Sequence, residues 1–291
     1  MTQRDLAWQS KLVLLAVAPV AAASAALEGQ WWALHQNAVA IWTFGLSALL
    51  GLVTWQVRAA TPAAAVTGAS ITASLMFTTV VFPYEPWHTA LTPVLAVSLL
   101  AFATTRLGRA KKERLGKAER RTGRSAAQVA ANLGVAALAT SEFVLSWVAD
   151  RRWFSHAAWG PAPLFTAALA AMAEAAADTV SSEVGQVFGG RPRMITNLRV
   201  VEPGRDGAVS AAGTLAGGLA AGIVAGGGTL ALRGDAREFM ESCAGGVFGL
   251  LFDSLLGATL EQYGWLNNDA VNFLATAAAA ALALGLEALR R

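Results

Sequence analysis

The sequence predicts an all-α membrane protein, a polytopic transmembrane helix bundle of about nine spans. Its 291 residues are 55% hydrophobic and 14% charged, a composition that does not suit a soluble domain. Three stretches contain no Asp, Glu, Lys or Arg: Gly29 to Val57 over 29 residues, and Ala59 to Tyr84 and Gly207 to Leu232 over 26 each. Because about 20 mainly apolar residues cross the hydrocarbon core, each stretch is long enough to span it.

The expected spans follow one another with short connections, so residues 1–291 are predicted to form a single integral membrane domain. The first span resembles a signal peptide, because Arg4 and Lys11 precede an apolar stretch that ends in small residues, but a retained span is favoured. Pro161 and Pro163 open the sixth span, where proline is tolerated. Windows of about 19 residues place the spans at Leu12 to Leu27, Val39 to Val57, Pro62 to Val81, Thr89 to Thr105, Ala126 to Val148, Pro161 to Phe188, Ala208 to Leu232, Glu241 to Leu260 and Ala270 to Leu289.

The positions of the cations predict the orientation. Residues 106–124 contain nine cations and two acids, and the positive-inside rule places this basic loop in the cytoplasm. Nine spans then put the N-terminus, Arg58 and the arginine loop 189–206 on the same side and the C-terminus outside. Arg151, Arg152, Arg290 and Arg291 fall on the other side, against the rule. We expect a bacterial-type inner or plasma membrane and a cytoplasmic active face.

Composition excludes several classes of site. Cys243 is the single cysteine, which excludes a disulfide framework and a zinc site built from cysteines. The net charge of +3 gives no reason to expect a nucleic-acid partner. His35, His88 and His156 are all predicted near the outer face, so chemistry at the basic face would use carboxylates, hydroxyls, amides and arginines. The oligomeric state stays open.

Residues 173–185, AEAAADTVSSEVG, place acids and hydroxyls at the cytoplasmic end of the sixth span. Glu174, Asp178, Ser181 and Ser182 follow helical spacing on one face. Glu183 is about 140° from Asp178 on a regular helix, so it joins them only if the helix ends or bends. Acids inside a span mark a polar cavity or an ion path, and oxygen ligands suit Mg²⁺; wet side chains at headgroup level are the alternative.

Residues 189–214 form a loop rich in glycine, proline and arginine that re-enters the membrane at Gly207. Arg191 and Arg193 could bind phosphate oxygens, and the turn into the next helix would present backbone N–H groups to an anion. The segment has no Walker motif, and a topology signal or contact with anionic lipid is the competing interpretation.

Two further polar groups interrupt apolar segments. Gln128 and Asn132 in QVAANLG are four residues apart. Together with Lys112 they are candidates for binding the substrate or nucleotide, and hydrogen bonding between helices is the competing interpretation of the two amides. Asp253 lies inside the eighth span, and a metal ion shared with Asp178 would compensate its charge.

These motifs together resemble the phytyl-phosphate kinase family of integral membrane proteins, which includes plastid members of the vitamin E pathway. The motifs are QVAANLG, DTVSSEVG, PRMIT, DGAVSAAGT and FDSLLGATLEQ, and the resemblance covers about two thirds of the chain, from about Leu46 to the end. They are more distantly similar to dolichol kinase and CDP-diacylglycerol synthase. The resemblance implies roles for residues of the acidic, arginine, re-entry and span motifs: Asp178, Ser182, Glu183, Arg193, Thr196, Ser210, Thr214 and Asp253. Leu133 in QVAANLG and the GRDG at the re-entry depart from the pattern, which weakens the case for Asn132 and Arg205.

The resemblance implies transfer of the terminal phosphate of a nucleoside triphosphate, with CTP the expected donor, to a prenyl monophosphate in the membrane. A phosphate monoester is mostly a dianion at neutral pH, so no histidine base is needed. We hypothesise Mg²⁺ on Asp178, Glu183 and Asp253, with Arg191 and Arg193 on the nucleotide. A cytidylyltransferase, a prenol or other lipid-alcohol kinase, and a transporter remain alternatives.

Overall fold

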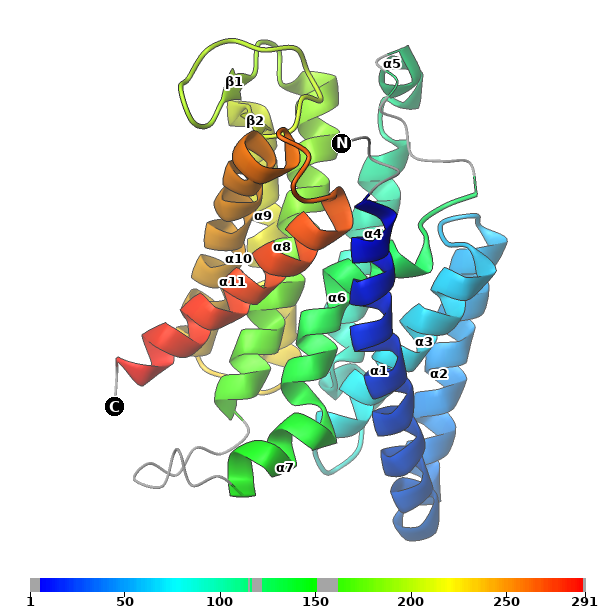
Figure 1. Cartoon of the computed structure of the whole chain (residues 1–291). Coiled ribbons are helices and arrows are strands. Elements are labelled where there is room, and N and C mark those ends of the chain that lie inside the picture. Colours follow the sequence, from blue (N-terminus) through cyan, green and yellow to red (C-terminus); the bar gives the residue numbers. More distant parts are fainter. Residues whose placement is uncertain (1–5, 115, 117–121, 151–161, 290–291) are drawn as a thin grey trace.

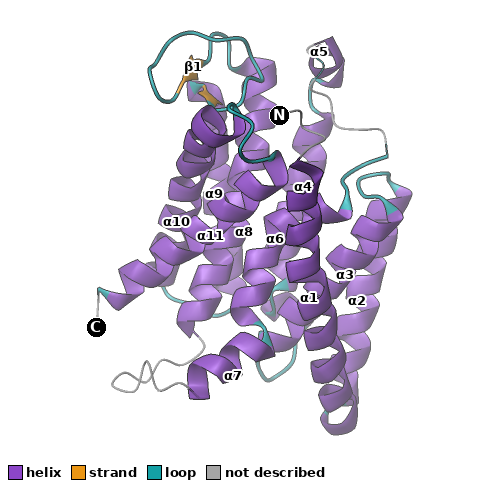
Figure 2. Cartoon of the chain, in the orientation of Figure 1, coloured by secondary structure: helices purple, strands orange, loops and turns teal. Residues whose placement is uncertain are grey.

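The fold is a bundle of helices (Figure 1). The computed structural model describes residues 6–114, 116, 122–150 and 162–289. Loops join the helices, and the strands among these residues are confined to one short antiparallel pair (Figure 2). The elements are α1 (Ala7–His35), α2 (Asn37–Gln56), α3 (Pro62–Thr78), η2 (Pro86–His88), α4 (Leu91–Arg106), α5 (Arg109–Arg114), α6 (Ala126–Thr140), α7 (Glu142–Asp150), α8 (Ala162–Phe188), β1 (Arg193–Met194), β2 (Ala208–Val209), α9 (Ala211–Ala231), α10 (Ala236–Leu256), η3 (Gly257–Glu261) and α11 (Asn268–Ala288).

The prediction of a helical membrane protein is confirmed, whereas the count of nine spans is not. Seven helices within the described residues are long and apolar enough to cross a membrane. The third and fourth predicted spans correspond to α3 and α4, which have only 17 and 16 residues. Seven is therefore the number of spans that length and composition support.

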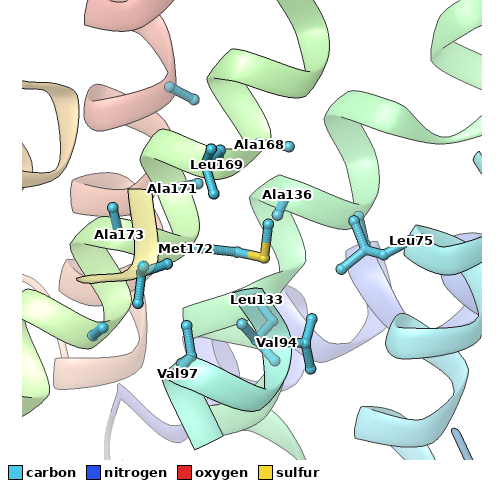
Figure 3. Packing of buried hydrophobic residues seen from close by; sticks show 14 of the residues in the cluster. Leu75, Val94, Val97, Leu133, Ala136, Ala168, Leu169, Ala171, Met172 and Ala173 are labelled. Carbon is cyan, nitrogen blue, oxygen red and sulfur yellow. The ribbon is translucent and has the colours of Figure 1, made fainter. Parts of the chain in front are cut away.

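Helix α8 lies at the centre of the bundle, in contact with α4, α6, α9, α10 and α11. Its middle is a run of alanines and other buried residues from Ala167 to Ala177. Figure 3 shows Met172 of α8 pointing toward Leu133 and Ala136 of α6. Because lipid offers little hydrophobic drive between helices, small side chains that allow close packing hold such a bundle together.

Small residues at helical spacing predict close packing at Gly213, Gly217, Gly222 and Gly226 of α9, and two of these glycines lie against α8. A Cβ at Gly213 would lie 2.7 Å from the Ser181 carbonyl oxygen, and one at Gly217 would lie 2.8 Å from that of Ala177. The packing role predicted for these two glycines is confirmed. For Gly222 it is wrong, because a Cβ there would meet nothing within 4 Å.

One end of the bundle gathers the segments that the sequence assigns to the cytoplasm. The beginning of α1, helix α5, the β1–β2 hairpin and the start of α11 all lie at the same end, at the top of Figure 1. Asn267 ties α1 to α11 there, since its Nδ2 donates to the Leu6 carbonyl and its backbone N–H donates to Gln9 Oε1. Asn267 thus links the first and last helices at the end that bears the basic segments.

Some positions used to predict the orientation lie outside the described residues. They are Lys117, Glu119, Arg120, Arg121, Arg151, Arg152, His156, Pro161, Arg290 and Arg291.

Candidate functional site

A polar cavity of about 370 Å³ lies at the end of the bundle where the basic segments gather. Its walls come from the first turns of α6 and α11, the last turns of α8, the loop that precedes α9, and the end of α10. A cavity of this size falls within the usual range for small-ligand sites, roughly 300–1,000 Å³.

Helix α8 contributes Asp178, Ser181 and Ser182 to one wall of the cavity. These residues are on adjacent turns, so an unbroken helix presents them together. The helix remains regular through Glu183 and ends at Phe188. Glu183 nevertheless lines the cavity, without the bend that its position in the sequence suggested.

The opposite wall comes from the end of α10, which supplies Asp253 and Ser254. The helix then widens into the π-helical turn η3, in which the Gln262 N–H donates to the Gly257 carbonyl at 3.1 Å. A Cβ at Gly257 would lie 2.8 Å from the backbone N of Gly207, so the re-entry loop lies directly on this turn. Such turns often occur at functional sites, and Gly257 and Glu261 of this one line the cavity together with Asp253.

Carboxylates outnumber cations along the described lining of the cavity. The acids are Asp178, Glu183, Asp206, Asp253 and Glu261, and the cations are Arg124 and Arg205. The charge of Asp253 is repelled by Asp178, Glu261 and Asp206. Like charges held this close inside a bundle require a bound cation or a lost charge.

The donor set fits a divalent cation. Asp253 Oδ2 is buried and has no hydrogen-bond partner in the described part of the chain, and the same is true of both carboxylate oxygens of Glu174, one turn deeper than Asp178. Carboxylate oxygens are ligands that Mg²⁺ prefers, and in phosphoryl-transfer sites it usually takes one or two of them together with substrate phosphates. Asp178 and Asp253 can supply that pair.

The three-carboxylate metal site predicted from Asp178, Glu183 and Asp253 is not preformed. No group of three or more His, Cys, Asp or Glu residues within the described ranges is placed to hold a metal ion. Glu183 Oε2 accepts a 2.5 Å bond from Lys112 Nζ, which also donates to the carbonyls of Thr104 and Thr105. All three N–H donors of Lys112 are used, and its side chain is 1% exposed. Lys112, predicted to bind the nucleotide, and Glu183, predicted to bind the metal, are therefore paired with each other in this structure.

We predict that Glu183→Gln destabilises the protein because it leaves the buried Lys112 ammonium without an anion. Loss of one partner from a buried ion pair costs about 3–5 kcal/mol. The double variant Lys112→Met/Glu183→Gln should recover much of that loss and keep most of the activity. Thermal unfolding in detergent measures the first effect. If the loss of stability in the double variant equals the sum of the losses in Lys112→Met and in Glu183→Gln, the two residues do not stabilise the protein as a pair.

Arg124 lines the polar cavity, although the sequence interpretation left it among the topology cations. Its Nη2 donates to Thr179 Oγ1 at 3.2 Å, and its charge acts on the neighbouring Asp178. The backbone of Arg124 pairs with the loop after α2, donating to the Ala59 carbonyl and accepting from the Thr61 N–H. The sequence did contain one indication of this position. Arg124 directly precedes Ser125, the N-cap of α6, which places Arg124 at the N-terminal end of a helix.

Gly123 sets this backbone pairing, and we predict that Gly123→Ala lowers both stability and activity. The residue has φ +81°, and a Cβ would collide with the backbone of Ala59. A non-glycine residue in this region costs about 1–2 kcal/mol before any collision. Gly116→Ala is the matched control, since Gly116 has φ +68° but an added Cβ would meet nothing within 4 Å. The thermal midpoints and turnover of the two variants distinguish the effect of the steric collision with Ala59 from the cost of the positive φ angle. Equal effects in both variants would contradict this role for Gly123.

The structure brings together most of the residues predicted for the site, and leaves others outside it. The cavity is lined by Asp178, Ser182, Glu183, Ser210, Asp253, Gln128 and Asn132, and it is not lined by Lys112, Arg191, Arg193, Thr196 or Thr214. Arg191 and Thr196 are exposed, and Arg193 donates to the Leu198 carbonyl in its own loop at 2.9 Å. Arg205 lines the cavity instead of Arg191 and Arg193.

Several polar residues of the lining also hold local structure. Gln128 Oε1 accepts from the Ser125 N–H in a capping box, and Asn132 Nδ2 donates to the Gln128 carbonyl. Ser210 caps α9 by accepting from the Gly213 N–H, and Ser182 Oγ donates to the Thr179 carbonyl. The amides thus bond within α6, and not between helices as the competing interpretation expected.

Comparison with known proteins supports the membrane assignment. Residues 45–280 match the family described as integral membrane protein DUF92. An uncharacterized membrane protein of Synechocystis sp. is 34% identical over 204 residues, which are 67% of this chain and 72% of that protein. An uncharacterized membrane protein of Methanocaldococcus jannaschii is 46% identical over 108 residues, 37% of this chain and 45% of that protein.

A chloroplast protein is also similar over a shorter stretch. The protein VTE6, chloroplastic, of Arabidopsis thaliana is 36% identical over 100 residues, which are 33% of this chain and 30% of that protein. This chain therefore matches less than half the length of the archaeal and plant relatives. No solved structure matches. Because the family match covers residues 45–280, most of the chain, the chain belongs to the DUF92 family of integral membrane proteins.

Proposed function

We propose that the protein is a membrane-embedded kinase that transfers the terminal phosphate of a nucleoside triphosphate, CTP in the first instance, to a prenyl monophosphate. The observation that carries this proposal is the meeting of Asp178 from α8 and Asp253 from α10 in one cavity that also contains Arg124 and Arg205. Oxygen ligands beside arginines at the end of a lipid-embedded bundle suit two phosphate-bearing reactants.

The excess of carboxylates means that two anionic reactants would enter this cavity only together with a divalent cation. A prenyl monophosphate and a nucleoside triphosphate are both strongly negative at neutral pH, and the described lining is itself net negative. Binding of both reactants therefore requires a divalent cation. When bound, Mg²⁺ supplies charge neutralisation and alignment, the two contributions that dominate phosphoryl transfer.

The chain's own residues then have separate tasks. Asp178 and Asp253 hold the cation, and Arg124 and Arg205 contact phosphate oxygens. The N-terminus of α9, whose first turn is capped by Ser210, directs backbone N–H groups toward the anion. Lys112 neutralises Glu183, and Lys111 Nζ donates to the Val187 carbonyl, so the two lysines hold α5 against the end of α8.

The reaction needs no general base. An oxygen of the prenyl phosphate attacks the terminal phosphorus of the nucleotide, a new P–O bond forms, and the bond to the bridging β–γ oxygen breaks. The products are the prenyl diphosphate and a nucleoside diphosphate. The acceptor is already mostly a dianion at pH 7, which agrees with the absence of histidine from the described lining.

Two further observations support the proposal. The motifs that resemble the phytyl-phosphate kinase family provide Asp178, Ser182, Ser210 and Asp253, which converge on the cavity. The similarity to a chloroplast protein agrees with the plastid members of that family. The cytoplasmic location of the cavity remains part of the proposal, supported by the basic segments at the same end.

Labelled nucleotides test the proposed reaction. The purified protein in detergent is given Mg²⁺, phytyl or geranylgeranyl phosphate, and CTP or ATP labelled in either the γ- or the α-phosphate. We expect the γ-label to appear in the prenyl diphosphate. Appearance of the α-label in lipid would replace the proposal with nucleotidyl transfer, and phosphorylation of phytol but not of its monophosphate would assign a lipid-alcohol kinase.

A further inference from the structure

A second cavity, of about 320 Å³, lies between α2, α3, α4 and α6. Two residues, Arg124 and Asn132, line both this cavity and the polar one. The two cavities therefore share a wall at the first turns of α6. Neither the predicted site residues of α8 nor those of α10 reach into the second cavity.

The two cavities differ in chemistry. The helical part of the second cavity is lined mainly by apolar residues, many of them small, such as Gly51, Ala65, Gly68 and Ala101. Its described lining contains no carboxylate. Its cations gather at the end beside the polar cavity: Arg58, Arg106, Arg109 and Arg124. An apolar body with a cationic mouth complements an amphiphile that has an apolar chain and an anionic head.

Local contacts keep the cationic mouth in place. Arg106 Nη2 donates to the Val57 carbonyl at 2.7 Å, and its guanidinium lies over the Phe102 ring at 3.6 Å. Arg109 pairs with Glu113. Arg124 is the cation common to both cavities, so a phosphate beside it would stand at the boundary between them.

We propose that this cavity binds the hydrocarbon chain of the lipid substrate, with its phosphate held at Arg124 and the reacting oxygen directed into the polar cavity. The inference rests on the proposed function and narrows the substrate class to single-chain phosphate lipids. The volume is near the lower end of the range for ligand cavities, so one chain enters and a two-chain glycerophospholipid does not. Gly68 and Ala69 of α3 line the depth of the cavity and set how much chain it accepts.

Gly68→Leu tests the chain site without touching the polar cavity. A Cβ at Gly68 would lie 3.7 Å from Val129 Cγ1, an ordinary contact, so the helix accepts a side chain that fills the cavity. Gly45→Leu of α2 is the matched control, because a Cβ there meets nothing within 4 Å and Gly45 lines neither cavity. Ser98→Leu places the same bulk in the cavity from α4, in case Gly68→Leu does not fold.

Photolabelling reads out binding independently of turnover. The full-length protein in detergent is treated with a prenyl monophosphate that has a diazirine at the end of its chain, and the labelled peptides are identified by mass spectrometry. We expect labelling of Pro62–Thr78 and Leu91–Arg106, competition by phytyl phosphate but not by phosphatidic acid or phytol, and loss of labelling in Gly68→Leu and Ser98→Leu but not in Gly45→Leu. Labelling spread over the lipid-facing helices, or equal competition by phosphatidic acid, would overturn the chain site.

Steady-state kinetics then connect the site to the reaction. In Gly68→Leu the KM for phytyl phosphate should rise at least ~10-fold, since a pocket distinguishes even single methylenes by 10-fold or more, while the KM for nucleotide and turnover of geranyl phosphate stay unchanged. An equal change for every chain length would contradict the proposal. If the wild-type protein transfers no phosphate at all, the proposed function fails, and the photolabelling result still decides whether the cavity holds a lipid chain.

Discussion

Asp178→Asn and Asp253→Asn are each expected to lower the rate of phosphoryl transfer by ~10³-fold or more, the scale at which groups that balance charge act in such reactions. Both residues line the polar cavity, and the carboxylate of Asp253 includes a buried oxygen without a partner in the described chain. A single carboxylate would hold the divalent cation too weakly to align the two anions. Initial rates with labelled nucleotide over a range of Mg²⁺ concentrations measure the effect.

The thermal stability of Asp253→Asn should rise although its rate falls. Asp253 shares one cavity with Asp178, Asp206 and Glu261 and has a buried oxygen without a partner in the described chain, so without a metal ion the fold must either bury its charge or bind a proton to remove it. Asp253→Asn removes that cost and should raise the thermal midpoint of the metal-free protein. Functional sites commonly lower stability in this way. Asp269→Asn is the matched control, since Asp269 is in the first turn of α11 but does not line the cavity. Full activity of Asp178→Asn would remove Asp178 from the metal site, and a lower thermal midpoint of metal-free Asp253→Asn would show that the carboxylate is compensated by groups of the chain itself.

Arg124→Ala should lower kcat/KM by about 10²–10³-fold, because it removes the cation that lines both cavities and that we propose contacts the substrate phosphates. Arg124→Lys should restore only part of the activity, since an ammonium cannot replace the two-pronged contact of a guanidinium. The thermal midpoint should fall in Arg124→Ala, since the remaining lining is more negative. Steady-state kinetics in both substrates give the measurement.

Arg114→Ala is the matched control for Arg124→Ala. It tests whether activity depends on the position of Arg124 or only on the net positive charge at this end of the bundle. Arg114 ends α5 in the same basic segment, is exposed, and lines neither cavity. A similar loss of activity in Arg114→Ala and Arg124→Ala would mean that net charge at this end of the bundle, and not the position of Arg124, attracts the substrates.

The sequence predicts the parts of this protein that depend on local pattern. Uncharged runs predict the helices, and i, i+4 spacing predicts that Asp178 and Ser182 share a wall of the cavity. The packing of Gly213 and Gly217 on α8 follows from small residues at helical intervals. In each case the physical cause lies within one or two turns of the chain.

Tertiary pairing decides what the sequence could not show. The Lys112–Glu183 pair joins residues 71 positions apart, and no spacing rule connects them, so the sequence assigned each residue a ligand role of its own and did not predict the pair. Arg193 bonds within its own loop, whereas Arg205 lines the cavity because Gly207 lies against η3. The lengths of α3 and α4 likewise depend on the loops that follow them, which hydropathy windows do not resolve.

Counting bound metal ions tests the central idea, that one divalent cation joins α8 to α10, most directly. Mn²⁺ prefers the same oxygen ligands as Mg²⁺ and can be counted by electron paramagnetic resonance in detergent, with a non-hydrolysable CTP analogue present. The account predicts a tight Mn²⁺ ion in the wild-type protein that is lost in Asp178→Asn and in Asp253→Asn, with no further loss in the double variant. Retention of that ion in either single variant would contradict it.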